Sequence, residues 1–514
     1  MSRLEFRPAI SLFLLVTMGS CAPAATHVAP DAEPAIDSEA SALLTAENAT
    51  TLSQGGGTPE QQAASPGWTH AEGGSGVSPE PVTAIGEGSA DGSSAAMEPS
   101  NAEESVVVFE PGTCVEGANI PDRGEDFLSE LLAQYPDKFA DIVADAEIRR
   151  AQIRVGEVGT NADGSTCVRY YSWREEAEYF YPASAIKTVG AVAALRTLEP
   201  FANDGWTVDT SLRIGERTIA TQDGNSVTVG EGRTASLRNL LEATLIESSN
   251  PGFNALYDIA GMEACNQEMW AAGFDQIRLF NRLQMGGTDP DAHRFVPSVD
   301  ARLDGEWVTL LDARETPVDN TPSDNTGARL EIGEAYVDDN TLARVEEPLS
   351  FARKNWISLR DLQGIILNLT HPELDGPERD LGLTDEHRQL LVDIMTGPLS
   401  DAGGTSAADR ESRFKPLLPG VLRVIPDRSQ LQYTNKAGRA YGFHLDSAYI
   451  RNLENGRSFY VAVTIHVDYD GVMNDGAYRH EAVSFPFLQD VGEVLARALL
   501  VEDQGTTLAA PPAR

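Results

Sequence analysis

Residues 180–188 read Phe-Tyr-Pro-Ala-Ser-Ala-Ile-Lys-Thr and open a segment that stays apolar or small as far as Leu195. A helix that is apolar on all sides belongs inside a domain, and Pro182 suits a first helical turn, where no N–H partner is needed. Ser184 and Lys187 are spaced i, i+3 and therefore share one helix face. A desolvated lysine beside a serine hydroxyl can activate a weak nucleophile. The motif is common by chance, so the alternative is a lysine that merely reaches solvent.

The composition narrows the class of partner. The chain has 514 residues and a formal net charge of −39 at pH 7. This acidity argues against nucleic acid or an anionic membrane surface as a partner. The length allows a large core and additional segments. No apolar run beyond the N-terminus is long enough to cross a bilayer.

The N-terminus predicts export. Arg3 and Arg7 precede an apolar stretch, Ala9 to Met18, and small residues follow. The run Met18-Gly-Ser-Cys21 resembles the lipobox of bacterial lipoproteins, which predicts a signal peptide over 1–20 and lipidation of Cys21. The alternative is an ordinary signal peptide cleaved after residues 22–24. Both alternatives place the protein in the cell envelope or periplasm. If Cys21 is lipidated, its N-terminal lipid anchor is the expected membrane contact.

The cysteines then lie in an oxidising compartment. There are four of them, at positions 21, 114, 167 and 265. If Cys21 carries lipid, at most one internal pair can form. Cys114 and Cys167 flank the first part of the folded region and are the preferred pair. Cys265 lies in a helical pattern and is expected to be a small buried apolar residue.

The pattern along the chain predicts an α+β fold. Residues 21–105 contain almost no large apolar side chain and are expected to be a disordered tether. A folded domain is predicted over 106–501, with a polar insertion at about 285–344 and a frayed tail at 502–514. Helical spacing occurs at 126–148 (divided at Pro136), 237–261, 359–369, 384–395 and 487–500. Strands are predicted at 151–158, 165–172, 431–435, 441–449 and 458–468.

Two further motifs follow the Ser184 segment. Ser248-Ser249-Asn250 lies in a break between helices, and Lys436-Ala437-Gly438 lies in a strand. Together the three resemble the S-x-x-K, S-x-N and K-T-G elements of class A β-lactamases and penicillin-binding proteins, in the same order and in similar contexts. The resemblance extends over about 123–500 without the insertion. It implies a five-stranded antiparallel sheet flanked by helices, an all-helical second lobe, and a site between the two.

The resemblance also implies the roles of individual residues. Ser184 would be the nucleophile and Lys187 its base, while Ser248 would pass a proton to the leaving nitrogen. Lys436 would tune Ser248 and attract a substrate carboxylate. The substrate-binding group comprises Asn250, Asn254, Ala437, Gly438 and Arg439. The N–H groups of Ser184 and Arg439 would form the oxyanion hole.

One departure from the family pattern concerns the carboxylate subsite. Ala437 replaces the usual Thr or Ser, and the loss of one charge-assisted hydrogen bond costs about 1.5–3 kcal/mol. Arg439 could offer a substitute cation, or it could simply point to solvent. Ordinary penicillin binding is therefore expected to be weakened and not abolished.

A second departure concerns the base for deacylation. Class A enzymes place a glutamate 34 residues after the asparagine of the second motif, and here that position is Gln284. A glutamine cannot act as a general base. If the insertion precedes this loop, Glu346 in the run Arg344-Val-Glu-Glu-Pro-Leu-Ser350 is the candidate. The alternative for Glu346 is a solvated acid in an acidic loop.

The leading hypothesis is therefore a serine hydrolase that opens β-lactams through an acyl-serine, without metal or organic cofactor. A second hypothesis is a D-Ala-D-Ala peptidase or esterase of the same fold, favoured if no glutamate serves the deacylating water. A third is a non-catalytic envelope protein that binds peptidoglycan. The intact motifs count against the third hypothesis. The substrate would be a small β-lactam or a peptidoglycan stem peptide, and the protein is expected to be a monomer.

Overall fold

The structure is a computed structural model that describes residues 112–220, 226–230, 232–284, 290–316, 330–339, 341–374, 379–399 and 405–501. The chain divides into the units Met1–Ala102 and Glu103–Arg514, and every described residue belongs to the second. The predicted signal peptide (1–20) with Cys21, the tether (21–105) and the tail (502–514) lie outside the described residues. Within the described ranges, no helix combines the length and apolar character needed to cross a membrane.

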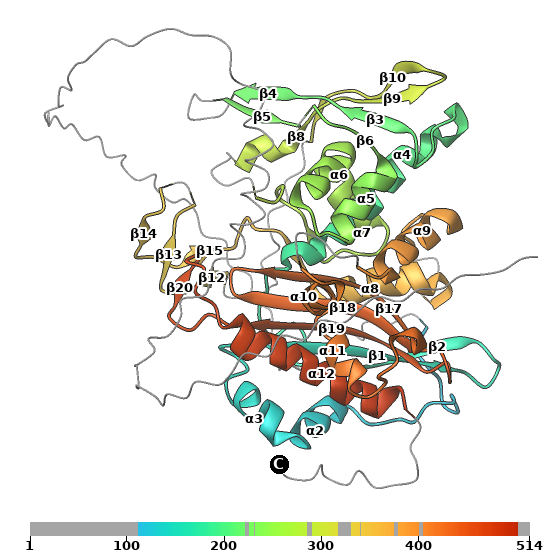
Figure 1. Ribbon diagram of the computed structural model, residues 1–514, viewed down its shortest axis with the longest axis vertical. Coiled ribbons are helices and arrows are strands. Elements are labelled where there is room, and N and C mark those ends of the chain that lie inside the picture. Colours follow the sequence, from blue (N-terminus) through green and yellow to red (C-terminus); the bar gives the residue numbers. More distant parts are fainter. Residues whose placement is uncertain are drawn as a thin grey trace, which may run out of the picture. The chain divides into compact units, whose positions relative to one another are not determined.

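A five-stranded antiparallel sheet lies at the centre of the fold, in the order β17-β18-β19-β1-β2 (Figure 1). Its strands are β1 (Gln152–Thr160), β2 (Thr166–Trp173), β17 (Leu431–Ala440), β18 (Phe443–Asn452) and β19 (Ser458–His466). Phe459, Val461 and Val463 belong to one apolar cluster, whereas Tyr460 and Ala462 belong to another. Successive strand residues point to opposite faces, so both faces of this sheet are covered. The predicted sheet is confirmed, with strands from both ends of the domain.

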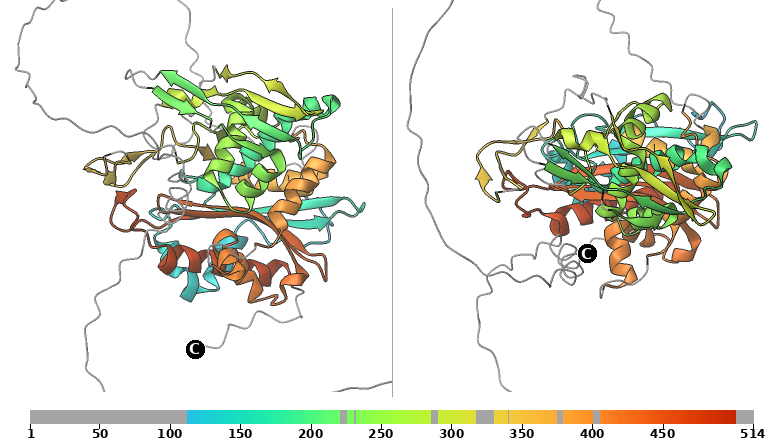
Figure 2. Two further views of the ribbon diagram at one scale, coloured as in Figure 1. Left: turned by 45° about the horizontal axis from the view of Figure 1, so that its top comes forward. Right: turned by 90° about the horizontal axis from the view of Figure 1, so that it is seen from above.

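One face of the sheet is covered by four helices (Figure 2). They are α2 (Phe127–Ala133), α3 (Pro136–Ala144), α11 (Leu418–Leu422) and α12 (Phe485–Leu499). Pro136 is the first residue of α3, where a missing N–H has no cost. The helical pattern predicted over 126–148 is therefore two helices, divided at that proline.

The apolar cluster on the opposite face of the sheet extends into the second lobe and includes residues from six helices. They are α4 (Lys187–Leu198), α5 (Leu237–Leu245), α6 (Asn250–Glu263), α7 (Met269–Ala271), α8 (Leu359–Thr370) and α9 (Asp385–Thr396). A further helix, α10 (Ala407–Phe414), precedes α11. The hydroxyl of Thr384 accepts a hydrogen bond from the N–H of His387 over 3.2 Å and so caps the start of α9.

The expectation of an all-helical second lobe is wrong, because this lobe also contains strands. A four-stranded sheet has the order β10-β9-β3-β6, formed by β3 (Ser211–Ile214), β6 (Thr234–Ser236), β9 (Val299–Leu303) and β10 (Glu306–Leu311). A hairpin joins β4 (Arg217–Ala220) and β5 (Ser226–Val229). In β9 the buried Val299 and Ala301 alternate with polar residues. The sequence did not reveal this two-residue period, because the surrounding stretch is mostly polar. Part of the predicted insertion thus folds into this lobe.

Short strand pairs complete the described fold. They are β7 (Ile277–Arg278) with β16 (Trp356–Ile357), β8 (Phe295–Val296) with β11 (Arg314–Glu315), and β12 (Glu331–Ile332) with β15 (Leu349–Ser350). A three-stranded group joins β13 (Ala335–Val337) to β14 (Arg344–Val345) and β20 (Val472–Met473), at the left in Figure 1. Its β13 and β14 derive from the predicted insertion.

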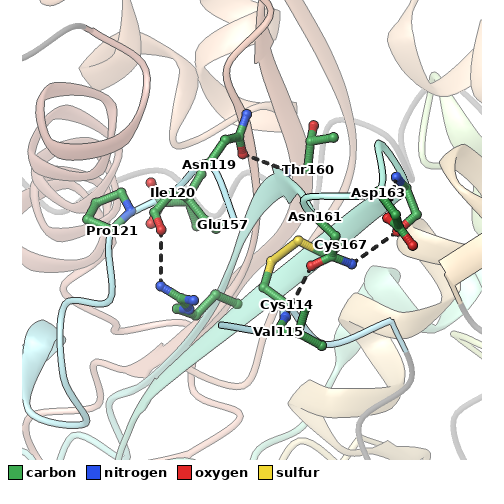
Figure 3. Close-up of a disulfide and its surroundings, with 12 residues drawn as sticks. Cys114, Val115, Asn119, Ile120, Pro121, Glu157, Thr160, Asn161, Asp163 and Cys167 are labelled. Carbon is green, nitrogen blue, oxygen red and sulfur yellow. Dashed lines mark hydrogen bonds between the residues drawn. A yellow bond between two sulfur atoms is a disulfide. The ribbon is translucent and has the colours of Figure 1, made fainter. Parts of the chain in front are cut away.

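A disulfide joins Cys114 to Cys167 on β2, with a Cα–Cα distance of 4.8 Å (Figure 3). The N–H of Cys114 donates to the carbonyl of Val168 over 3.1 Å, and the N–H of Val168 donates to the carbonyl of Gly112 over 2.8 Å. The first described residues therefore lie along the edge of β2. Cys265 is free and buried, and burial raises the pKa of its thiol to about 12.

Candidate active site

Ser184 lies in a 3₁₀ turn, Ala183–Ile186, directly before α4. Ala183 has a φ of 46°, a left-handed conformation that is strained for a residue with a Cβ and often marks functional sites. From Tyr181 to Leu195, all of which the structure describes, Ser184 is the only residue that is not buried. The turn therefore presents one hydroxyl at the surface of an otherwise enclosed segment.

Lys187 lies beneath this hydroxyl and is completely buried. Its Nζ is 3.0 Å from Ser184 Oγ and 3.3 Å from Ser248 Oγ, and it also donates to the carbonyl of Ser248. Burial, followed by the nearby charge of Lys436, holds the pKa of Lys187 well below its usual value. A neutral amine can accept a proton, so Lys187 is suited to act as the base for Ser184.

Ser248 faces the same point from the loop before α6. Its φ of 54° turns the backbone sharply, while the neighbouring Ser249 caps α6 by accepting from the N–H of Gly252 over 3.0 Å. Lys436 Nζ donates to Ser248 Oγ over 2.9 Å. Burial lowers the pKa of Lys436 to about 7. The structure thus brings together all four residues predicted for proton transfer from the three motifs.

Gly438 permits β17 to approach the Ser184 turn. A Cβ at this position would lie 2.3 Å from the carbonyl oxygen of Pro182 and 3.1 Å from the backbone nitrogen of Ser184. Contacts this short exclude any side chain. The two segments that carry the predicted oxyanion-hole donors, the N–H groups of Ser184 and Arg439, are therefore in direct contact.

Asn254 is buried and does not present its amide to a substrate. Its Nδ2 donates to the carbonyl of Leu283 over 2.9 Å, and its Oδ1 accepts from the N–H of Leu283 over 2.8 Å. Both polar atoms are thus occupied by backbone, and Asn254 holds a loop in place. Asn250, the other predicted amide, is the first residue of α6 and is partly exposed.

This loop, residues 279–284, is held by several buried side chains. Asn266 exchanges hydrogen bonds with the backbone of Leu279, and Asn355 does the same with Asn281 and also accepts from the N–H of Phe280. The guanidinium of Arg282 bonds to Asp258, and both side chains are almost fully buried. The backbone path is therefore fixed up to Leu283 and Gln284. Sequence reasoning missed these anchors because a buried asparagine has no sequence signature of its own.

Gln284 follows the anchored residue and has an exposed side chain and a φ of 55°. Leu283, which Asn254 holds, packs in the apolar cluster of the second lobe. Neither side chain can remove a proton from water. The structure therefore places no base at either of the last two described positions of this loop.

Glu346 lies elsewhere, in the turn after β14. Its carboxylate pairs with Arg344 at 2.9 Å and the side chain is 75% exposed. None of its described contacts is with the residues around Ser184. The structure thus matches the alternative stated for Glu346, a solvated acid, because a two-residue edge strand gives it no buried partner.

Two further predicted residues have definite places on β17. Ala437 is buried and carries no hydroxyl. The guanidinium of Arg439 lies over the ring of Phe485 at the start of α12, with a distance of 5.3 Å to the ring centre. Arg439 is therefore partly engaged by an aromatic face, and the structure does not show it aimed at the Ser184 hydroxyl.

Among the described residues, no group of three or more His, Cys, Asp or Glu side chains is arranged to hold a metal ion. The groups that the site does offer are two serine hydroxyls and two buried amines. These groups can move protons and form an ester, which is the chemistry of acyl transfer through a serine.

The fold and this site define a class, the serine hydrolases of the β-lactamase and penicillin-binding-protein superfamily. Within that class the chain belongs to the β-lactamase enzyme family, whose model matches residues 139–484. The matched range includes Ser184, Lys187, Ser248 and Lys436. No curated protein matches the chain.

Several solved structures match this chain. A mutant of PBP-A in an acyl-enzyme complex with penicillin G is 15% identical, with 74% of this chain and 98% of that chain covered and a TM-score of 0.40. A β-lactamase from Sphaerobacter thermophilus is 13% identical, with coverages of 72% and 96% and a TM-score of 0.38. A β-lactamase from Desulfarculus baarsii is 16% identical, with coverages of 71% and 98% and a TM-score of 0.37.

Proposed function

We propose that the protein opens β-lactam amides by forming an ester at Ser184, as a β-lactamase-like hydrolase. The observation that carries the proposal is the fully buried Lys187, whose Nζ lies 3.0 Å from Ser184 Oγ. A lysine in this position has lost its hydration and can hold its amine neutral. It can then take the proton of Ser184 as the hydroxyl attacks.

The steps follow from the hydrogen bonds. Ser184 Oγ attacks the lactam carbonyl, the C–N bond breaks, and the leaving nitrogen needs a proton. Ser248 Oγ can supply it, because it lies between Lys187 and Lys436 at 3.3 and 2.9 Å. The proton that Lys187 received can return through the same hydroxyl. Water then hydrolyses the ester and releases the product acid.

A second candidate function is a D-Ala-D-Ala peptidase or esterase that uses the same acylation chemistry. The anchored loop favours it, because Asn254 fixes Leu283 and Gln284 follows, and neither side chain is a base. Without a general base at these positions the ester formed with a β-lactam would be long-lived. The two functions therefore share acylation and differ in the rate of acyl release.

Intact-mass spectrometry of the exported protein with benzylpenicillin distinguishes these functions over time. We expect one added penicillin mass in the wild type and none in Ser184→Ala, whose folding is checked by circular dichroism. A mass that disappears as penicilloate accumulates supports the β-lactamase function, and a mass that persists for hours supports the peptidase or esterase. Labelling of Ser184→Ala, or a wild type that no β-lactam or D-Ala-D-Ala ester acylates, would overturn the proposal.

Export and anchoring are part of the same proposal. The Met18-Gly-Ser-Cys21 run and the disulfide of Cys114 both support an oxidising envelope compartment. We expect a lipid-modified Cys21 at the N-terminus of the mature chain, and a monomer in detergent. Mass spectrometry of the N-terminal peptide tests the modification, and an unmodified N-terminus after residues 22–24 would replace it with an ordinary signal peptide.

A further inference from the structure

The short helix α10 is attached at its end to the strand that carries Lys436. The carbonyl of Phe414, the last residue of α10, accepts a hydrogen bond from Asn435 Nδ2 over 2.9 Å. Lys415, which follows, is almost completely buried, and its Nζ donates to Asn435 Oδ1 over 3.1 Å. Because Asn435 directly precedes Lys436, the end of α10 is fixed beside the residue whose amine bonds to Ser248.

The same helix reaches the second motif through an ion pair. The guanidinium of Arg410 on α10 pairs with the carboxylate of Glu247, through Nη2 and Oε2. The side chain of Arg410 is 7% exposed and that of Glu247 is 47% exposed. The guanidinium also lies 5.9 Å from the centre of the Phe414 ring. Since Glu247 directly precedes Ser248, the ion pair lies one residue from the proposed proton donor to the leaving nitrogen.

Ser248 has a backbone conformation that depends on such support. Its φ of 54° belongs to the left-handed region, which residues with a Cβ seldom adopt unless the surrounding structure holds them there. Lys187 donates to its carbonyl, and Lys436 donates to its hydroxyl. Arg410 holds the residue just before it, from the helix that also fixes the strand of Lys436. The contact between Ser248 and Lys436 is thus reinforced by a second connection, which passes through α10.

We infer that Arg410 is a positioning residue for the proton transfer by Ser248 and acts through Glu247. The inference rests on the proposed acyl transfer at Ser184. When the lactam C–N bond breaks, the nitrogen takes the proton of Ser248 Oγ, and Ser248 is reprotonated by Lys187, which holds the proton of Ser184. Arg410 itself transfers no proton, because a guanidinium stays charged. It keeps the Ser248 hydroxyl within reach of both the leaving nitrogen and the lysines.

Two acylating probes separate this positioning role from a general effect on folding. Benzylpenicillin expels an amine nitrogen, which must be protonated as it leaves. The phenylacetylglycyl ester of 3-hydroxybenzoic acid carries the same phenylacetamido group and a carboxylate. It expels a phenolate, which can leave without a proton because a phenol has a pKa of about 10. A misplaced Ser248 hydroxyl should therefore slow the first probe far more than the second, whereas a general loss of structure would slow both.

Arg410→Gln and Glu247→Gln should each lower the second-order rate constant for acylation by benzylpenicillin about tenfold, a part of the ~10²–10⁴-fold that proton transfer contributes. The rate constant for the ester should stay near that of wild type. The double variant should be no slower than either single variant, because both substitutions remove the same ion pair. Arg410→Lys should restore part of the rate. The matched control is Arg238→Gln on α5, which removes an ion pair with Asp209 and should match wild type with both probes.

A second measurement does not depend on acylation. In protein labelled with [6-¹³C]lysine, substitution of each of the five lysines assigns their signals. The Lys187 and Lys436 signals, which both report on Ser248, should move in the two single variants and stay in place in the control. An equal fall for both probes, additive effects of the two substitutions, or unmoved lysine signals would overturn the inference. If neither probe acylates the wild type, the proposed function fails, and the lysine signals still decide whether Arg410 positions Ser248.

Discussion

Asn254 and Leu283 exchange two hydrogen bonds, at 2.9 and 2.8 Å, that join the side chain of α6 to the backbone of a loop. The pair fixes the backbone position of Leu283, and a leucine side chain can neither accept nor donate a proton. A buried amide that satisfies both a carbonyl and an N–H leaves the backbone little freedom. At Leu283 and Gln284, the last two described residues of this loop, no side chain can act as a base for acyl release.

The first prediction concerns these positions. Leu283→Glu and Gln284→Glu each introduce a carboxylate at the end of the anchored loop. The variant whose carboxylate reaches the ester should release benzylpenicillin faster, because general-base assistance is worth about 10²–10⁴-fold. The decay of acyl-enzyme, followed by mass spectrometry after removal of free penicillin, measures this. Glu346→Gln is the control, and slower release in that variant would return Glu346 to the mechanism.

The second prediction concerns the charge of Lys187. Acylation should rise with pH as Lys187 loses its proton, through a pKa well below the usual lysine value. It should fall again as Lys436, with a pKa of about 7, loses its own. Lys187→Arg keeps a positive charge but cannot accept a proton, so acylation should drop by about 10²–10⁴-fold. Lys138→Arg on α3 should behave like wild type. Normal acylation of Lys187→Arg would exclude Lys187 as the base.

The third prediction concerns the contact between β17 and the Ser184 turn. Gly438→Ala would place a methyl group 2.3 Å from the carbonyl of Pro182, so the strand or the turn must shift. We expect a loss of about 1–3 kcal/mol in unfolding free energy together with a large fall in acylation rate. Gly215→Ala is the control, because its nearest atom is the movable hydroxyl of Ser298 at 3.1 Å. Wild-type acylation in Gly438→Ala would show that the close approach is dispensable.

The fourth prediction concerns the missing hydroxyl at Ala437. Ala437→Thr should strengthen the binding of β-lactams that carry a carboxylate, by about 1.5–3 kcal/mol for one charge-assisted hydrogen bond. Ala437→Val has nearly the same shape without the hydroxyl and should give no such gain. The concentration dependence of acylation separates binding from the chemical step. Equal gains in both variants would assign the effect to packing.

The sequence predicted those parts of the site that depend on local pattern. The three motifs in order carry the resemblance to the family, and that resemblance implied the central sheet, the helices on its faces and the proton-transfer residues. The fold then brings Lys436 on β17 to Ser248, with its Nζ 2.9 Å from Ser248 Oγ. The predicted pair of cysteines is also joined in the structure.

Other features depend on contacts that no local pattern encodes. Asn254, which anchors Leu283, lies 29 positions from it in the sequence. Asn355, which anchors Asn281 in the same loop, lies 74 positions from it. The sequence did not predict β9 and β10, because short strands within a mostly polar stretch resemble a loop. In each case tertiary structure supplied the partner that explains the residue.

The bond between Cys114 and Cys167 closes a covalent ring that contains all of β1 and the exposed turn at Asp163. A protease that cuts inside this ring cannot separate the two products, because the sulfur bridge still connects them. Such nicked molecules would keep their full mass on a non-reducing gel and divide only after a reductant is added. Whatever precedes residue 114 therefore stays attached to the hydrolase domain even when the peptide chain behind it has been cleaved.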